Sequence, residues 1–257
     1  MTLSQSTPQQ PALFAAFDRI RIVNLPSRQD RRNEMERQLS RVELKGDLRV
    51  SYFPAVSCVD RGLFPRKGDH GCFQSHFTIL KEAAEAGQSV LILEDDCDFL
   101  LPAISEFTLP ETFDIFYGGY HAADPENLIE SDIIGSHFMG FSASGARIAF
   151  DYFTRYLDPQ FPPDPKAATQ PGFNPEIRPP IDGGYVWMRR AHPELVTVFA
   201  MLSVQRPSRT DIGEPRWFDR MAGIRDVVEH LRRLRHRVSD APRGMSQANA
   251  HFGARGD

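Results

Sequence analysis

The stretch Val90-Leu91-Ile92-Leu93-Glu94-Asp95-Asp96 joins a short apolar run to three consecutive carboxylates. The apolar part alone fits a helix or a strand, but a helical pattern before it, ended by Gly87, favours a buried parallel strand. In open α/β sheets, ligands bind beyond the carboxyl ends of the strands. We therefore expect the three carboxylates to lie where such a sheet binds its ligand.

Strands and helices alternate on both sides of this stretch. Apolar runs and alternation predict strands, and apolar residues at helical spacing predict helices. Alternation of the two predicts an α/β fold with a mostly parallel central sheet. The predicted strands cover residues 19–25, 49–56, 114–117 and 136–142, and the predicted helices cover residues 28–43, 72–86 and 143–157.

The remaining segments suggest how the chain is organised. Residues 1–16 are rich in Gln, Ser, Thr and Pro and are expected to form a flexible leader. We expect residues 17–232 to form a single domain, with a proline-rich loop or lid over residues 158–180. The basic and then Gly-rich residues 233–257 are expected to be a flexible tail.

Composition restricts the class of protein. A formal net charge of −4 argues against a general nucleic-acid binder, which usually carries a basic face. The three cysteines have no metal-site spacing, so we expect reduced thiols and a cytoplasmic protein. We see neither a signal peptide nor a membrane span, although an acceptor on a membrane would require peripheral contact with that surface.

The carboxylate triplet has two interpretations. Like charges disfavour mutual ionisation, and a hard divalent cation such as Mg²⁺ or Mn²⁺ would relieve that cost through oxygen ligands. Such a cation can also bridge a substrate diphosphate and neutralise the charge of a departing nucleoside diphosphate. The alternative is a solvated turn whose acids cap the next element, and composition alone favours neither.

Six motifs in order resemble glycosyltransferase family 25, which includes lipooligosaccharide and collagen galactosyltransferases. They cover roughly residues 19–213. The sequence differs from the family pattern after His76, where a tryptophan is often found, and after Asp182, where bulkier aliphatic residues are usual. The motifs are Asn24-Leu25-x-x-Arg28-x-Asp30-Arg31-Arg32, Gly71-Cys72-x-x-Ser75-His76, Leu91-Ile92-Leu93-Glu94-Asp95-Asp96-x-x-Phe99, Gly140-Phe141-Ser142-Ala143-Ser144-Gly145-Ala146, Pro180-Ile181-Asp182 and Val204-Gln205-x-x-Ser208-x-x-Asp211-Ile212.

The resemblance implies a GT-A-like, Rossmann-like nucleotide-sugar-binding domain. It implies inverting transfer of a hexose, most commonly galactose, from a UDP-sugar to a saccharide or glycoconjugate, with Mn²⁺ or Mg²⁺. Lipopolysaccharide biosynthesis is one such setting, and the acceptor could be lipid-linked. By this analogy Asp96, with Asp95 or Glu94, holds the metal and the diphosphate. The donor-binding residues it implies are Asn24, Arg28, Arg31, Ser75, His76, Glu94, Asp95, Gln205 and Ser208.

Arginines and a histidine lie beside these motifs. Arg28 and Arg31 stand at a predicted helix N-terminus, where anions are favoured, and could bind the donor diphosphate. The alternative is a solvated basic face. His76 lies one turn after Cys72, but the two alone would not make a zinc site, because further ligands are missing. A packed, hydrogen-bonded His76 is the plainer interpretation, whereas the family pattern places it near the donor.

Asp182 is a candidate general base. Inverting transfer needs a base to take the proton of the acceptor hydroxyl as it attacks the anomeric carbon. A carboxylate after a proline-rich loop, in a Gly-Gly bend, could reach that position. The alternative is a turn residue bonded to local backbone. Asp211 is the reserve candidate.

Two other classes of protein remain open. A non-catalytic sugar-nucleotide-binding scaffold could keep the same core, although all three acids of the triplet are present. A phosphoryl-receiver domain also places acids after an apolar strand to hold Mg²⁺. That architecture needs its acid pair after the first strand, whereas here the acids follow a later one.

Overall fold

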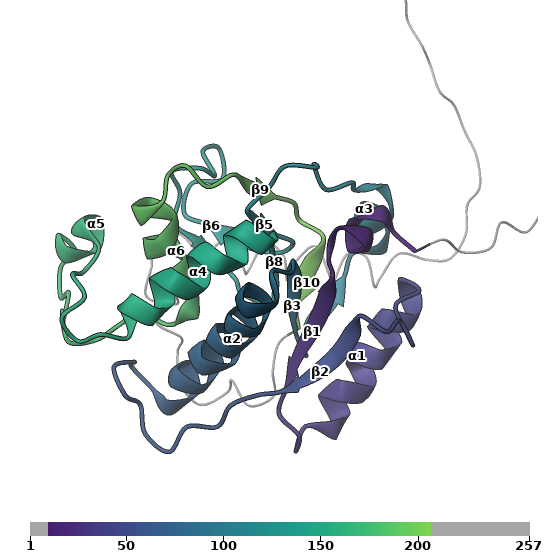
Figure 1. Ribbon diagram of the computed structural model, residues 1–257, viewed down its shortest axis with the longest axis horizontal. Coiled ribbons are helices and arrows are strands. Elements are labelled where there is room, and N and C mark those ends of the chain that lie inside the picture. The colour runs from purple at the N-terminus through teal and green to yellow at the C-terminus, as the bar shows by residue number, and fades with distance from the viewer. Residues whose placement is uncertain (1–9, 207–257) are drawn as a thin grey trace, which may run out of the picture. The chain divides into compact units, whose positions relative to one another are not determined.

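The computed structural model describes residues 10–206 of the chain. These residues form a six-stranded sheet of order β2-β1-β3-β8-β5-β9, in which only β8 runs antiparallel to its neighbours (Figure 1). The mostly parallel α/β fold predicted from the sequence is confirmed, and it is consistent with a Rossmann-like fold. The strands of this sheet are β1 Arg19–Asn24, β2 Val50–Pro54, β3 Val90–Glu94, β5 Ile115–Tyr117, β8 Phe138–Phe141 and β9 Thr197–Phe199.

Helices cover both faces of the sheet. One hydrophobic core packs α2, α4 and α6 against one face, where α2 and α4 lie side by side (Figure 1). A second core packs α1, α3 and the 3₁₀ helix η1 against the other face. The helices are η1 Ala12–Ala16, α1 Gln29–Arg41, α2 Lys67–Ala86, α3 Leu101–Glu106, α4 Ala143–Tyr156, α5 Pro165–Ala168 and α6 Ile181–Ala191.

Two small antiparallel pairs complete this part of the chain. β6 (His121–Ala122) pairs with β7 (Ile133–Ile134). β4 (Cys97–Phe99) pairs with β10 (Ser203–Gln205), so that Gln205 lies opposite Cys97. The second pair returns a distant segment of the chain to the end of β3.

Helix α2 begins five residues before the predicted start at residue 72. Its first turns pack tightly against the chain after β2. A Cβ on Gly71 would lie 2.3 Å from the carbonyl oxygen of Val56, so the close approach requires glycine here. Ser75 Oγ accepts a hydrogen bond of 2.9 Å from the Val56 amide and donates one of 2.8 Å to the Gly71 carbonyl. At the other end, Gly87 has φ 62° and ends the helix, as predicted.

The expected leader over residues 1–16 differs from the structure at its end. Residues 12–16 form η1, and the side chains of Leu13 and Phe14 are fully buried in the core with α1. Two large apolar side chains close to a strand account for this, because burying each removes apolar surface from water. The boundary predicted at residue 232 lies outside the described residues.

The region around Asp182 also differs from expectation. Asp182, Gly183 and Gly184 were expected in a bend, but they form the first turn of α6. Helix formation here buries Ile181 and Tyr185 in the core, which offsets the poor helix propensity of two glycines. The proline-rich segment before it contains the short helix α5.

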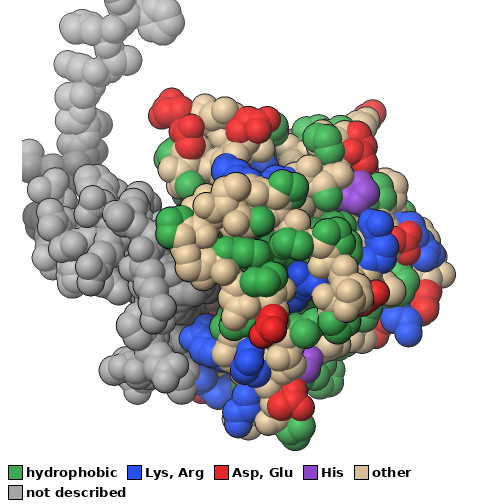
Figure 2. All heavy atoms as spheres, turned by 90° about the vertical axis from the view of Figure 1, so that its left-hand side faces the viewer, with side chains coloured by type: hydrophobic (Ala, Val, Ile, Leu, Met, Phe, Trp, Pro, Cys, Tyr) green, Lys and Arg blue, Asp and Glu red, His purple; other side chains and the backbone are tan. Residues whose placement is uncertain are grey.

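The surface, the cysteines and the helices bear on further expectations. On the face in Figure 2, Lys and Arg side chains lie among Asp and Glu side chains at the right of the view, and several Lys and Arg side chains lie close together at its lower left. All three cysteines are free thiols. Among the described helices, none has the length and apolar character needed to cross a membrane.

Candidate functional site

The side chains of the acidic triplet point to two different faces of the sheet. Along a strand, successive side chains alternate between faces. Leu91 and Leu93 lie in the core with α1, whereas Val90 and Ile92 lie in the core with α2. By the same alternation Glu94 faces α2, and Asp95 faces α1. The three carboxylates therefore do not gather at one point, as the predicted three-acid metal site would require.

Asp95 and Asp96 belong to a group that we call the strand-end cluster: Asn24, Arg31, Asp95, Asp96 and Gln205. Asn24 Nδ2 and Arg31 Nη1 each donate to an oxygen of Asp95, and both donor–acceptor distances are 2.7 Å. Arg31 Nη1 also lies 3.5 Å from Asp96 Oδ2. The Asp95 and Asp96 side chains are only 8% and 7% exposed. Arg31 therefore compensates two nearly buried carboxylates at once.

Gln205 reaches this cluster through the pairing of β10 with β4. Its Nε2 lies 3.4 Å from both carboxylate oxygens of Asp96. The amide of Arg206 donates to the Asp96 carbonyl at 2.7 Å, which fixes the turn after β3. The family resemblance assigned Gln205 to the donor, and the structure places it against the predicted metal ligand.

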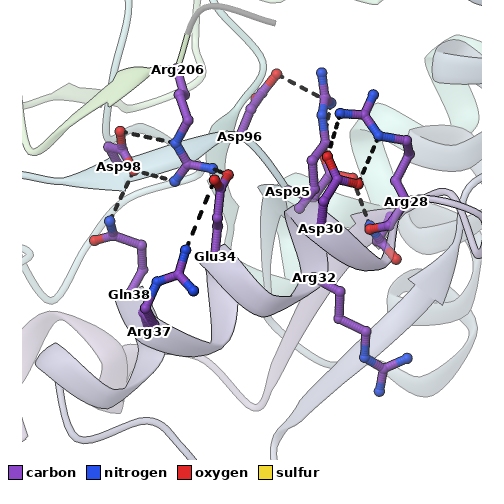
Figure 3. A network of polar contacts seen from close by, with 12 residues as sticks. Arg28, Asp30, Arg32, Glu34, Arg37, Gln38, Asp95, Asp96, Asp98 and Arg206 are labelled. Atoms are coloured by element: carbon purple, nitrogen blue, oxygen red, sulfur yellow. Dashed lines mark hydrogen bonds and ion pairs between the residues drawn. The ribbon is translucent and has the colours of Figure 1, made fainter. Parts of the chain in front are cut away.

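An ion network adjoins the strand-end cluster (Figure 3). Arg206 lies between Asp98 and Glu34 and pairs with both. Gln38 Nε2 donates to Asp98 Oδ1 at 2.9 Å. Asp98, Arg206 and Glu34 were not among the predicted site residues. The network ties α1, β4 and the end of β10 together beside the two acids.

Glu94 belongs to a second group, the buried histidine cluster: Cys72, His76, Glu94, Ser136 and Tyr185. Glu94 Oε1 accepts from Ser136 Oγ at 2.7 Å and lies 3.5 Å from His76 Nε2. Burial alone would raise the pKa of Glu94, but the charge and contact of His76, with the Ser136 hydroxyl, outweigh it and lower that pKa. Burial raises the pKa of the Cys72 thiol well above its usual value.

His137 and Asp182 lie near this second cluster. His137 is 3% exposed, and burial lowers its pKa to about 4, so its imidazole is neutral at pH 7. Asp182 lies within electrostatic reach of Cys72, Tyr117 and Tyr185. Asp182 lies in the first turn of α6, and α6 packs in the core with α2, on the face of the sheet toward which Glu94 points. Neither Ser136 nor His137 was singled out in the sequence, although both lie in a segment predicted as a strand.

Among the other predicted donor-binding residues, Arg28 adjoins the strand-end cluster, since its carbonyl accepts a hydrogen bond of 3.3 Å from Asn24 Nδ2, whereas Ser75 lies in α2. Arg28 precedes α1, and its guanidinium forms a bidentate pair with Asp30, which lowers the pKa of that carboxyl to about 2. Ser75 is fully buried, and its hydroxyl bonds the backbone of residues 56 and 71. Its observed role is structural. Ser208 and the reserve base Asp211 lie outside the described residues.

The chemistry of the strand-end cluster fits a hard divalent cation. Two carboxylates and one guanidinium leave a net charge of −1. Carboxylate and amide oxygens are the ligands that Mg²⁺ and Mn²⁺ prefer, with substrate phosphates completing the set. Asp95 and Asp96 would supply such oxygens, and Gln205 Nε2 faces both oxygens of Asp96. Glu94 is not part of this cluster, because its carboxylate contacts Ser136 and His76 on the other face of the sheet.

These features define a Rossmann-like α/β domain with a carboxylate and arginine site at the carboxyl end of a central strand. The chain is 27% identical over 117 residues to procollagen galactosyltransferase 1-A of Xenopus laevis, covering 38% of this chain and 18% of that protein. It is 29% identical over 102 residues to procollagen galactosyltransferase 1-B of Xenopus laevis, covering 33% and 17%.

A further relative bears on whether such a domain is active. The chain is 27% identical over 147 residues to the probable inactive glycosyltransferase 25 family member 3 of Bos taurus, covering 46% of this chain and 24% of that protein. The matched segments thus span about a fifth of the length of these relatives. No family model matches the chain. The similarity supports a relationship to glycosyltransferase family 25 over part of the chain.

Proposed function

We propose that this protein is a glycosyltransferase that uses a UDP-sugar donor with Mn²⁺ or Mg²⁺. The observation that carries the proposal is the convergence of Asp95 and Asp96 on Arg31, at the carboxyl end of β3. Sheets of this kind bind ligands at that edge. The partial similarity to procollagen galactosyltransferases supports galactose as the sugar. The acceptor in this proposal is a saccharide or glycoconjugate.

The residues of the strand-end cluster have distinct roles in this proposal. Asp95 and Asp96 hold the cation and, through it, the donor diphosphate. Arg31 pairs with the two carboxylates and offers a positive charge to the departing diphosphate. Asn24 and Gln205 orient the carboxylates through their amides. When bound, the cation supplies neutralisation of the charge that develops on the leaving nucleoside diphosphate.

Asp182 is the proposed base that takes the proton of the acceptor hydroxyl. Asp182 lies in the first turn of α6, which packs in the core opposite to that of α1. Inverting transfer needs a base on the side of the donor from which the acceptor attacks, opposite to the leaving diphosphate, and we propose Asp182 for that role. Asp182→Asn should lower turnover by about 10²–10⁴-fold while leaving UDP affinity unchanged. Equal losses of turnover and of UDP affinity would contradict the assignment.

A donor panel tests the function without a known acceptor, through slow donor hydrolysis. Purified protein is incubated with several UDP-sugars and Mn²⁺ or EDTA, and released UDP is quantified. Metal-dependent release from one donor would identify the sugar. Asp96→Asn should abolish it, whereas Asp151→Asn, an exposed acid on α4, should not. Release that survives EDTA would contradict a metal-assisted reaction.

A non-catalytic scaffold is the second candidate function. The similarity to the probable inactive glycosyltransferase 25 family member 3 supports this second candidate. A scaffold would bind UDP or a UDP-sugar without releasing UDP, whereas the proposed enzyme does both. Calorimetric titration with UDP and Mn²⁺, beside the turnover assay, separates them. If no UDP binds in the presence of metal, both candidates are wrong.

A further inference from the structure

A second set of metal-binding side chains lies on the α2 face of β3. Cys72, His76 and Glu94 each offer one ligand atom, and the three atoms lie within 4.8 Å of one another. His76 Nε2 is 3.5 Å and Cys72 Sγ is 3.9 Å from Glu94 Oε1. Ligand atoms around tetrahedral zinc are roughly 3.3–3.8 Å apart, given bonds of about 2.0–2.3 Å. Small side-chain movements would therefore complete the geometry.

The three ligands come from two elements that the fold holds together. Cys72 and His76 lie one turn apart on α2, so their side chains share a face. Those two residues alone were insufficient for a zinc site. Glu94 supplies the third ligand from the end of β3, because strand alternation turns its side chain toward α2. Folding thus brings the third ligand beside the other two.

Outer contacts orient two of these ligands. The Tyr185 hydroxyl lies 3.0 Å from His76 Nδ1 and can accept a hydrogen bond from Nδ1–H, which would make the Nε2 lone pair available to a cation bound beside Glu94. His76 is fully buried, and Nε2 has no hydrogen-bond partner among the described residues. Ser136 Oγ holds Glu94 Oε1 at 2.7 Å. Histidine and carboxylate ligands of metals are commonly oriented by such contacts.

We propose that Cys72, His76 and Glu94 bind Zn²⁺, with the fourth position open to water. A thiolate, a carboxylate and a neutral imidazole balance the charge of the dication, so the buried site is neutral. Thiolate and imidazole select zinc, whereas the carboxylates of the strand-end cluster suit Mn²⁺ or Mg²⁺. This site is separate from the proposed diphosphate site and does not depend on transferase activity.

Metal binding to the full-length protein tests the proposal. The metal-free protein is titrated with Co²⁺, which takes the place of zinc and reports its ligands by absorption. The wild type should bind about one Co²⁺ with an intense sulfur-to-cobalt band and the visible bands of tetrahedral cobalt. Zn²⁺ should displace it and raise the Tm. Absence of the sulfur band in the wild type would overturn the proposal, whatever the UDP-release assay shows.

Variants assign the ligands. Cys72→Ser should abolish the sulfur band, and His76→Gln should weaken cobalt binding at least tenfold, with folding checked by circular dichroism. Cys58→Ser is the matched control, since Cys58 lies outside the cluster, and it should retain the full spectrum. Asp96→Asn should also retain it. A sulfur band that persists in Cys72→Ser would overturn the proposal.

Discussion

At the scale of single residues, Arg31 compensates the negative charge of the strand-end cluster. Its guanidinium is the positive group that lies between Asp95 and Asp96, and both acids are nearly buried. Removing one partner of such an arrangement leaves uncompensated charge, which costs more than the contact itself contributes. The proposed function places a divalent cation beside the same two carboxylates.

Arg31→Ala should lower the free energy of unfolding by about 1–3 kcal/mol. Mn²⁺ should restore part of the loss, because the proposed cation compensates the same two carboxylates. Thermal unfolding with Mn²⁺ and with EDTA measures both effects. Arg37→Ala is the control, since the Arg37 side chain is 69% exposed. If Mn²⁺ raises the Tm no more in Arg31→Ala than in wild type, Asp95 and Asp96 do not bind it.

His137 should make stability fall on mild acidification. Burial lowers its pKa from 6.5 to about 4, so between these pH values the unfolded chain binds a proton that the folded protein does not. Stability is then lost as the pH falls from about 6.5 to 4, by up to about 3 kcal/mol. Glu94 adds a further loss of stability only below about pH 4.5, because 4.5 is the usual pKa of its carboxyl and the folded protein lowers it.

Tm measured against pH tests this expectation. His137→Leu should flatten the profile between pH 6.5 and 4. His121, whose pKa burial also lowers, contributes in the same direction and remains in this variant. An unchanged slope in His137→Leu would show that this imidazole is not the group responsible.

At the scale of elements, the contact between α2 and the chain after β2 positions the buried histidine cluster. Gly71→Ala would place a methyl group 2.3 Å from the Val56 carbonyl oxygen, so the helix or the loop must move. We expect a loss of about 1–3 kcal/mol. Gly68→Ala is matched, because it lies on the same helix with no atom within 4 Å. It should be neutral or stabilising by up to about 1 kcal/mol.

Urea denaturation of the two glycine variants measures the difference. A Gly71→Ala protein as stable as Gly68→Ala would contradict the close packing described here. The same variant should weaken cobalt binding at Cys72 and His76, since both residues follow Gly71 in α2. Retained cobalt affinity in a destabilised Gly71→Ala protein would show that the cluster tolerates movement of the helix start.

The helix η1 is an element that sequence analysis assigned to the leader. Phe14 is fully buried and packs against Phe99, with ring centroids 6.0 Å apart. Phe14→Ala should therefore cost about 3–5 kcal/mol. Leu48→Ala, at a fully exposed leucine, should change stability by less than about 0.5 kcal/mol. Equal stability of the two variants would restore the leader interpretation.

Most long elements were predictable and most short ones were not; the exceptions are the short strand β5, which was predicted, and the long helix α6, which was not. Apolar periodicity identified β1, β3, α1 and α4 within a few residues, because each repeats its pattern over several positions. Strands of two or three residues, such as β4 and β10, have too few positions for any pattern. Asp182 was placed in a bend because Gly-Gly is a poor helix sequence, and tertiary burial of α6 overrode that preference.

At the scale of the whole molecule, the candidate site depends on contacts between distant segments. Arg206 pairs with Glu34 across 172 positions, and Gln205 reaches Asp96 across 109. No local pattern could reveal these pairs. By contrast, the separation of Glu94 from Asp95 was predictable from the sequence, because alternation along β3 requires these two side chains to face opposite sides of the sheet. The family resemblance named most of the residues, and the fold sorted them into two clusters.

In the proposed function, Asp96 supports metal-dependent use of a UDP-sugar. The most direct test is the rate of UDP release by wild type and Asp96→Asn, each with Mn²⁺ and with EDTA, on the donor that the panel identifies. We predict release by wild type with Mn²⁺ only, and a loss of at least about a hundredfold in Asp96→Asn. Equal rates in the two proteins, or release that EDTA leaves unchanged, would show that Asp96 does not support a metal-dependent transfer.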